Sequence, residues 1–273
     1  MVRSLWTAAT GMIAQQNNVD TIANNLSNVN TMGYKTQQME FKSLLYQTLQ
    51  TRTTSANGAY KPSSAQVGLG VRNASITTIY KNGPMLANES PTAFAISGKG
   101  FFAVHGDDGN TYYTRNGNFQ WSLASEDSYM LADSNGWPVL DTKGDPIILD
   151  GNIYDVTQVV VTADGTVCYP DENNNPQSLG ITVGLYQFNN PGGLEKKDST
   201  LYEQTAASGA PINEAASLTV EKSKVIQGYL EGSNVQIVDE MVNMIVAQRA
   251  YEMNSKAIIA SDEMLQQANN LRR

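Results

Sequence analysis

The sequence has few of the residues on which most enzyme active sites depend. Its 273 residues include one histidine, His105, and one cysteine, Cys168. A single histidine nearly excludes His-based triads and multi-histidine metal sites, and no histidine lies near Cys168 in sequence to activate its thiol. One cysteine also excludes an internal disulfide framework. We therefore expect no catalytic residue and no metal ligand at either position.

Runs of basic residues and long apolar runs are also missing. The net charge is −8 and the sequence pI is about 4.7, which argues against nucleic-acid binding because that affinity rests on clustered Lys and Arg. No window approaches the roughly 20 apolar residues that span a bilayer. Threonine and glutamine interrupt residues 1–16, so we expect no cleaved signal peptide.

Segments that resemble ligand-binding motifs are incomplete. Asp171, Asn173 and Asn175 imitate the start of a calcium-binding EF-hand loop, but Pro176 and Thr182 occupy the positions of the required glycine and glutamate. Two Gly-x-Gly pairs lack the third glycine of a dinucleotide site, and no P-loop occurs. The sequence therefore predicts no cofactor.

Apolar residues recur every seven positions at both ends of the chain. The N-terminal row is Leu5, Met12, Val19 and Leu26, and the C-terminal row is Ile237, Met244, Tyr251, Ile258 and Leu265. This spacing is typical of one helix face. Each segment has more apolar surface than a lone helix can bury, so we expect the two ends to pack on each other and then on other copies of the chain. An assembly protein is favoured over an enzyme.

The predicted fold class is α+β, with N- and C-terminal long helices forming a coiled-coil-like bundle, an all-β antiparallel middle domain and an extended arm. The first helix is expected at Ser4–Val29 and the last at Asn234–Leu271, where Ser233 and Gln236 have the spacing of a capping box. Asp239 and Glu240 favour the start of that helix, and Arg272 and Arg273 its end. The segments predicted between and around them are 1–35, 36–91 (arm and strand), 92–210 (β-rich), 211–232 (return) and 233–273.

Turn signals and β-branched or aromatic runs alternate through the middle of the chain. Asn116-Gly117 and Asp164-Gly165 are two of the turn signals, and Phe101–His105 and Tyr112–Arg115 are two of the expected strands. Further strands are expected at Val71–Ile79, Asp155–Val161 and Ile181–Phe188, and a short amphipathic helical turn at Phe41–Leu49. This pattern indicates an antiparallel sandwich or barrel.

Several strings resemble the bacterial flagellar rod and hook protein family. The N-terminal strings are residues 4–6 (SLW), 10–12 (TGM) and 23–35 (ANNLSNVNTMGYK). The middle ones are 98–104 (GKGFFAV) and 113–119 (YTRNGNF), and the C-terminal ones are 227–231 (QGYLE), 233–235 (SNV), 240–245 (EMVNMI), 248–252 (QRAYE) and 254–257 (NSKA). Within the family, the length and the arm around residues 46–70 are most similar to the distal rod members.

The resemblance implies a structural subunit of the distal rod, which polymerises into a hollow helical drive shaft that transmits torque from motor to hook. It implies that the chain passes through the flagellar type III export apparatus and lies in the basal body, at the periplasmic to outer-membrane level. The implied partners are copies of the same chain, proximal rod proteins, the hook protein and basal-body ring proteins. The arm is expected to wedge between subunits and stiffen the tube.

The apolar rows and the resemblance together predict the residues of a subunit interface. On the N-terminal helix they are Leu5, Ala9, Met12, Gln16, Val19, Ile22, Asn24, Asn25, Leu26 and Asn28, followed by a turn motif of Gly33, Tyr34 and Lys35. On the C-terminal helix they are Ile237, Met241, Met244, Ile245, Gln248, Arg249, Tyr251, Asn254, Ile258 and Leu265. The asparagines either form a solvated polar face or bond neighbouring subunits through their amides and fix register.

Two other functions fit the same sequence. One is a proximal rod or hook subunit of the same family, although the arm and a single modest middle domain argue against hook. The other is an extracellular β-sandwich protein that binds or hydrolyses glycans and oligomerises through its helical ends.

Overall fold

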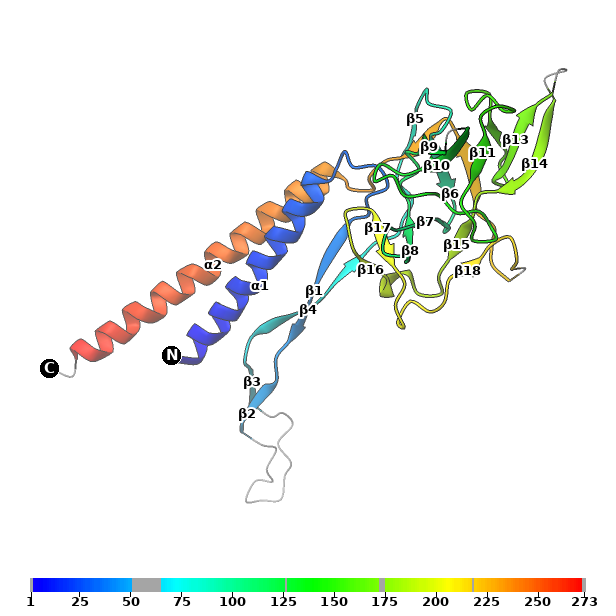
Figure 1. The fold of residues 1–273 in the computed structure, drawn as a ribbon. Helices are drawn as coiled ribbons and strands as arrows, with labels where there is room; N and C mark the ends of the chain where they lie inside the picture. Colours follow the sequence, from blue (N-terminus) through cyan, green and yellow to red (C-terminus); the bar gives the residue numbers. More distant parts are fainter. Residues whose placement is uncertain (1, 51–64, 126, 172–174, 218, 272–273) are drawn as a thin grey trace. The chain divides into compact units, whose positions relative to one another are not determined.

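A computed structural model describes residues 2–50, 65–125, 127–171, 175–217 and 219–271 (Figure 1). The chain divides into two compact units. The helical unit comprises residues 1–27, 37–77 and 236–273, and the β-rich unit comprises residues 28–36 and 78–235. Each unit therefore combines segments that are far apart in the sequence.

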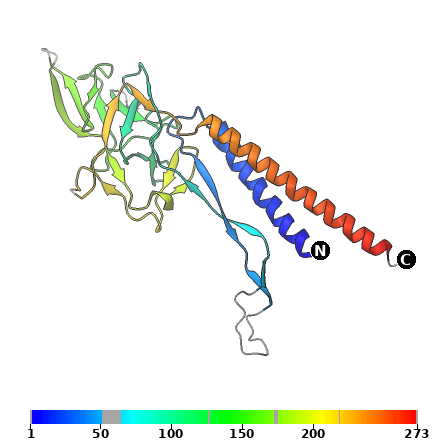
Figure 2. The ribbon, with the colours of Figure 1, turned by 180° about the vertical axis from the view of Figure 1, so that it is seen from behind.

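Two long helices dominate the helical unit. They are α1, Val2–Ser27, and α2, Ile237–Asn270, and they run side by side in opposite directions (Figures 1 and 2). Ser4 Oγ lies 3.3 Å from Ser261 Oγ, and Asn25 Nδ2 lies 3.3 Å from Glu240 Oε2. Neither helix is long and apolar enough, over its described residues, to cross a bilayer.

Within its described residues, the helical unit also contains four strands. β1, Gln37–Ser43, pairs with β4, Val71–Thr78, and β2, Tyr46–Gln50, pairs antiparallel with β3, Ala65–Gly68. The strand expected at Val71–Ile79 is confirmed, but the helical turn expected at Phe41–Leu49 is wrong. Backbone hydrogen bonds from Leu44 N to Gly70 O and from Leu69 N to Leu45 O continue the ladder there. Most of the predicted arm, residues 51–64, falls outside the described residues.

The β-rich unit is built on a six-stranded antiparallel sheet in the order β16-β17-β8-β7-β15-β18. Smaller sheets join β11-β10-β9, β12-β13-β14, β19-β6 and β20-β5. The strands are β5 Met85–Ala87, β6 Phe94–Ser97, β7 Phe101–His105, β8 Thr111–Thr114, β9 Gln120–Ser125, β10 Ser128–Ala132, β11 Ile148–Asp150, β12 Val160–Val161, β13 Thr166–Pro170, β14 Pro176–Thr182, β15 Leu185–Gln187, β16 Glu195–Lys196, β17 Leu201–Glu203, β18 Ile212–Asn213, β19 Lys224–Gln227 and β20 Tyr229–Glu231; a 3-10 turn spans Pro191–Gly193. The antiparallel β-rich middle is as predicted.

The central strand β7 is buried on both faces. Because side chains alternate along a strand, Phe102 and Val104 enter one apolar cluster, whereas Phe101 and Ala103 enter another. Strands β7 and β8 confirm the expected runs. Of the expected run Asp155–Val161 only Val160–Val161 is strand, and the expected run Ile181–Phe188 is split between β14 and β15.

The start of α2 differs from the predicted capping box. Helix α2 begins at Ile237, its N-cap residue is Gln236, and no side chain caps it. Ser233 Oγ instead accepts a hydrogen bond from Val235 N at 3.3 Å, so it closes a turn before the helix. Asp239 and Glu240 do occupy the first turn, while Arg272 and Arg273 lie outside the described residues.

Candidate assembly interface

The seam between α1 and α2 is lined by small and polar side chains. Ala8 and Ala247 are buried, Ser4 contacts Ser261, and Gly11 faces Asn254. Contacts of this kind remove little apolar surface from water, and apolar burial is the main source of helix-packing stability. Close approach and hydrogen bonds therefore act beside the buried Ile22 and the half-buried residues of the apolar rows.

Asn25 connects three elements of the helical unit. Its Nδ2 donates to Gln37 O at 2.7 Å, and its Oδ1 accepts from Gln37 N at 2.9 Å. The same Nδ2 lies 3.3 Å from Glu240 Oε2, and the Asn25 side chain is 1% exposed. The expectation that this amide bonds a neighbouring subunit therefore needs correction: α1, β1 and α2 of the same chain use it.

The outer faces of the two helices expose large apolar side chains. Trp6 of α1 is 68% exposed, and Val238 of α2 is 73% exposed. The other exposed apolar residues on the pair are Ile13, Ile237, Met241, Val242, Ile245, Val246, Tyr251, Met253, Ile259 and Met264. Contiguous exposed apolar surface marks a site of interaction with another molecule.

The predicted interface residues fall into two groups. Those exposed to solvent are Gln16, Asn24, Ile237, Met241, Ile245, Gln248, Arg249 and Tyr251. Those buried or half-buried in the chain itself are Leu5, Ala9, Met12, Val19, Ile22, Asn25, Leu26, Asn28, Met244, Asn254, Ile258 and Leu265. The apolar rows thus serve two surfaces, the seam within the chain and the outer faces of the pair.

The three residues of the predicted turn motif are buried in the β-rich unit. Tyr34 and Lys35 are both 0% exposed. Lys35 Nζ donates to Glu231 Oε1 at 2.6 Å and to Lys81 O at 2.9 Å, and Lys196 Nζ lies 4.3 Å from the centroid of the Tyr34 ring. The motif therefore organises the fold locally rather than presenting these side chains to solvent.

Glu231 is the anion of a buried ion cluster that also contains Lys35 and Arg115. Arg115 Nη1 lies 3.3 Å from Glu231 Oε2, and Arg115 Nη2 donates to Gly98 O at 2.9 Å. Gly83 N donates to Glu231 Oε1 at 2.9 Å. These contacts satisfy both carboxylate oxygens, which is the condition under which a buried charge is tolerated.

Burial dominates the electrostatics of the cluster. Desolvation lowers the pKa of Lys35, the Glu231 carboxylate opposes this shift, and the positive charge of Arg115 adds to it. The pKa of Arg115 is lowered for the same main reason, loss of water around its guanidinium. One carboxylate, that of Glu231, thus stabilises the charged forms of two cations that are shielded from water.

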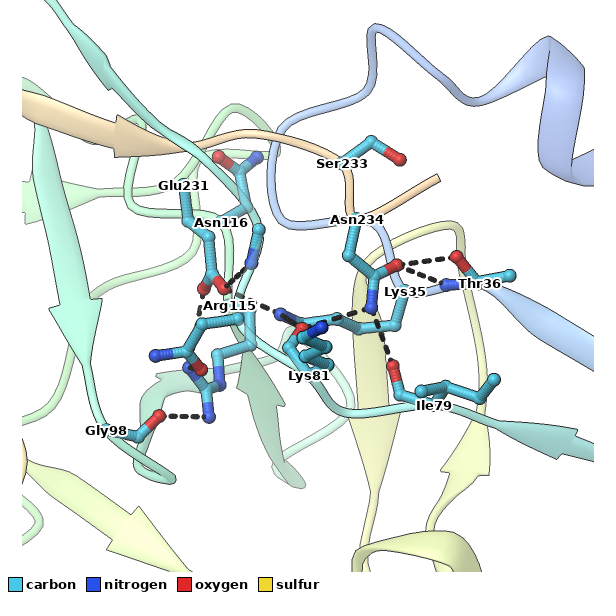
Figure 3. Close-up of polar contacts among 12 residues, drawn as sticks. Lys35, Thr36, Ile79, Lys81, Gly98, Arg115, Asn116, Glu231, Ser233 and Asn234 are labelled. Atoms are coloured by element: carbon cyan, nitrogen blue, oxygen red, sulfur yellow. Dashed lines mark hydrogen bonds and ion pairs between the residues drawn. The ribbon is translucent and has the colours of Figure 1, made fainter. Parts of the chain in front are cut away.

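Asn234 and Gly33 form hydrogen bonds that connect the chain segments around this cluster. Asn234 Oδ1 accepts from Thr36 N and Thr36 Oγ1, both at 2.7 Å, and its Nδ2 donates to Ile79 O at 2.8 Å (Figure 3). Gly33 N donates to Glu231 O at 2.7 Å. Gly33 has a φ of +72°, a conformation that favours glycine. A Cβ at this position would also lie only 2.6 Å from Asn116 N, so no other residue fits.

Sequence reasoning assigned no role to Arg115, Glu231 or Asn234. All three lie in strings that resemble the family, residues 113–119, 227–231 and 233–235. This resemblance is the one sequence feature that could have marked them as functional residues. Within the described residues, His, Cys, Asp and Glu side chains form no group that could hold a metal ion.

Comparisons with known proteins place this architecture in one class, the rod and hook proteins of the bacterial flagellum. Residues 5–35 match the model "Flagella basal body rod protein", residues 95–169 match "Flagellar hook protein FlgE/F/G D1 domain", and residues 226–271 match "Flagellar basal body rod FlgEFG protein C-terminal". Within that class, the chain belongs to the flagellar basal-body rod protein FlgG family.

Similar proteins match over their whole length. The chain is 44% identical to the flagellar basal-body rod protein FlgG of Borreliella burgdorferi, over 100% of both chains. It is 39% identical to that of Caulobacter vibrioides, over 99% of this chain and 100% of the relative, and 34% identical to that of Bacillus subtilis, over 100% of both. These likenesses do not favour a proximal rod or hook subunit, nor a glycan-binding or hydrolytic protein.

Proposed function

We propose that this chain is a non-enzymatic subunit of the distal flagellar rod that polymerises with copies of itself into a hollow helical drive shaft, which transmits torque from motor to hook. Full-length likeness to basal-body rod proteins supports the rod assignment. The observation that carries polymerisation is the apolar outer surface of α1 and α2, with Trp6 at 68% and Val238 at 73% exposure. Such side chains are stabilised when a neighbouring copy covers them.

The arrangement of the surface favours an open polymer over a closed dimer. Apolar residues occur along nearly the whole of α2, from Ile237 to Met264, on more than one side of the helix. A surface that extends around a helix pair offers contacts to several neighbours at once, and head-to-tail contacts that do not close generate filaments. The coiled-coil-like bundle predicted from the sequence is, in this proposal, the packing of helix pairs from adjacent subunits.

Further parts of the proposal rest on the family and on the sequence pattern. The partners would be proximal rod proteins, the hook protein and basal-body ring proteins, with delivery by the flagellar type III export apparatus to the periplasmic to outer-membrane level. The five segments predicted from the sequence pattern, including the arm at residues 36–91, would be the parts that the subunit uses in the rod. Wedging of the arm between subunits rests on the composition of the arm, which is polar and has too little apolar content to order itself.

Polymerisation of the purified chain tests the proposal. We expect the wild-type chain at high concentration to form tubes visible by negative-stain electron microscopy. Val246→Glu should suppress them, because Val246 is 63% exposed on α2 and a carboxylate there would lose water on contact with a neighbour. The expected result is at least about a tenfold higher critical concentration, equivalent to ~1.4 kcal/mol per contact.

The matched control is Asn243→Asp, which adds the same charge at a position of α2 that is already polar and exposed. Circular dichroism should show unchanged helix content in both variants. Soluble wild-type monomers at every concentration, or equal polymerisation of Val246→Glu and wild type, would refute self-assembly through this face.

A further inference from the structure

The α1–α2 seam holds one register over its whole length. Ser4 contacts Ser261, Gly11 faces Asn254, and Asn25 bonds Glu240. Successive contacts are separated by seven and then fourteen residues on both helices, as the numbering shows. The same register places Asn18 opposite Ala247, which is 2% exposed. Heptad spacing is the repeat at which two helices keep the same faces in contact.

Most residues in this seam discriminate poorly between registers. Ala8, Ala247 and Ser261 are small and of similar volume, so a slip of one heptad exchanges one small side chain for another. The Ser4–Ser261 contact joins two hydroxyls, and the Asn25–Glu240 contact adds specificity at the other end of the seam alone. Packing of small residues alone would therefore allow neighbouring registers of similar free energy.

Gly11 and Asn254 differ from the rest of the seam in shape. A Cβ built on Gly11 would lie 2.8 Å from Asn254 Nδ2, 3.2 Å from its Cγ and 3.2 Å from its Oδ1. The whole amide group therefore packs against Gly11. Exchanging the amide nitrogen and oxygen would not remove its overlap with a Cβ at position 11. Gly11 is the only glycine of α1, so the Asn254 side chain has one place along α1 into which it fits.

We propose that Asn254 is the register-determining residue of the helix pair and that Gly11 is the hole that receives it. The function goes beyond stability, because register decides which exposed apolar residues of α1 stand beside those of α2. A slip of one heptad would displace Trp6 and Ile13 by about 10 Å along α2. The composite outer surface would then no longer match a neighbouring copy.

Disulfide trapping in the dilute monomer measures register directly. In a Cys168→Ser background, Ser4→Cys with Ser261→Cys reports the observed register, because the two Oγ atoms are 3.3 Å apart. Ser4→Cys with Ala268→Cys reports a slip of one heptad in one direction, and Asn18→Cys with Glu240→Cys reports a slip of one heptad in the other. Intramolecular cross-linking rates under mild oxidation are compared on non-reducing gels.

Three variants distinguish a register determinant from a merely stabilising contact. Asn254→Ala should raise the slipped cross-linking rates on the order of tenfold, equivalent to ~1.4 kcal/mol of lost discrimination between registers. Gly11→Leu should lower the in-register rate by a similar factor. Gly11→Leu with Asn254→Gly exchanges the large side chain and the glycine between the two helices, and should restore the in-register cross-linking rate.

Controls keep the outcome decisive if Gly11→Leu fails to fold. Asn243→Ala, an exposed asparagine on the same helix, should leave all three rates unchanged. Fraying of the helices would also raise slipped cross-linking, so a gain in Asn254→Ala supports the proposal only when circular dichroism shows wild-type helix content. Unchanged slipped cross-linking rates in Asn254→Ala would overturn the proposal. So would an in-register cross-linking rate in Gly11→Leu with Asn254→Gly that is no higher than in folded Gly11→Leu. Because the monomer is measured, either result is independent of whether the chain polymerises.

Discussion

At the scale of single residues, Glu231 is the carboxylate that balances two buried cations, Lys35 and Arg115. Lys35 and Glu231 are 196 residues apart in sequence and both side chains are at most 1% exposed, as is that of Arg115. A buried ion pair adds little to stability compared with a well-packed apolar core, but removing one partner is costly because the other charge stays buried. The cluster is thus more sensitive to substitution than its size suggests.

Glu231→Gln is expected to destabilise the β-rich unit by about 3–5 kcal/mol. The substitution keeps the shape of the side chain but leaves Lys35 and Arg115 buried without an anion. Urea titration should show a lower midpoint at an unchanged slope. Glu252→Gln, which breaks the exposed pair with Arg249 at 2.8 Å, is the control and should cost less than ~0.5 kcal/mol. Equal midpoints for the two variants would contradict the importance of the cluster.

Tyr202→Phe is expected to stabilise the chain by on the order of 1 kcal/mol, because the Tyr202 hydroxyl is buried without a hydrogen-bond partner. Burial also raises the pKa of Tyr202 far above its ordinary value. Above pH ~10 the unfolded chain loses this proton while the folded chain keeps it, so wild-type stability falls as pH rises. The advantage of the phenylalanine variant should therefore grow above pH 10 in urea titrations.

Tyr112→Phe is the control for that substitution, since its hydroxyl donates to Asp108 Oδ2 at 2.6 Å. It should destabilise the chain. A loss of stability in Tyr202→Phe at neutral pH would show that its hydroxyl has a role that the structure does not reveal.

At the scale of elements, the turn at Gly33 shows how a backbone conformation positions a site. Gly33 combines a φ of +72° with backbone atoms of Arg115 and Asn116 within 3.0 Å of an added Cβ. Its amide bonds Glu231 O, and Lys35 follows two residues later. A change in this turn would therefore move Lys35 relative to the carboxylate that it needs.

Gly33→Ala is expected to destabilise the β-rich unit by at least ~2 kcal/mol more than Gly136→Ala. Both glycines have positive φ, but an added Cβ at Gly136 meets nothing within 4 Å. The control thus isolates the cost of the left-handed conformation, roughly 1–2 kcal/mol, from overlap with the backbone. Thermal or urea unfolding measures both, and equal losses would mean that the turn relaxes freely.

Elements with a regular apolar period were predictable, whereas contacts across the sequence were not. The heptad rows located both helices, and β-branched or aromatic runs located β7 and β8. The spacing of Phe41–Leu49 predicts a helical turn but is ambiguous over so short a run, and pairing with β3 and β4 makes it strand instead. The ion cluster could not be derived, since no local pattern joins Lys35 to Glu231.

The predicted interface between subunits stays a prediction, and the structure shows how its residues are used within the chain. The apolar rows suggested that the helices meet through their large side chains. Close contacts between α1 and α2 join glycine, serine, asparagine and glutamate side chains, while Met12, Val19 and Ile258 of the apolar rows are half-buried. Period alone cannot separate a seam within one chain from a surface for another, because both follow the same repeat.

At the scale of the whole molecule, the exposed apolar faces of the helix pair have a thermodynamic consequence. A pair that leaves Trp6 and Val238 largely exposed lacks the stability that their burial would add, and that part must come from whatever covers its outer faces. By mass action, a partner that binds only the folded form raises the melting temperature as its concentration rises. The helical unit should therefore melt at a temperature that increases with the total amount of chain in the cell of a calorimeter, whereas the β-rich unit should melt at a fixed one.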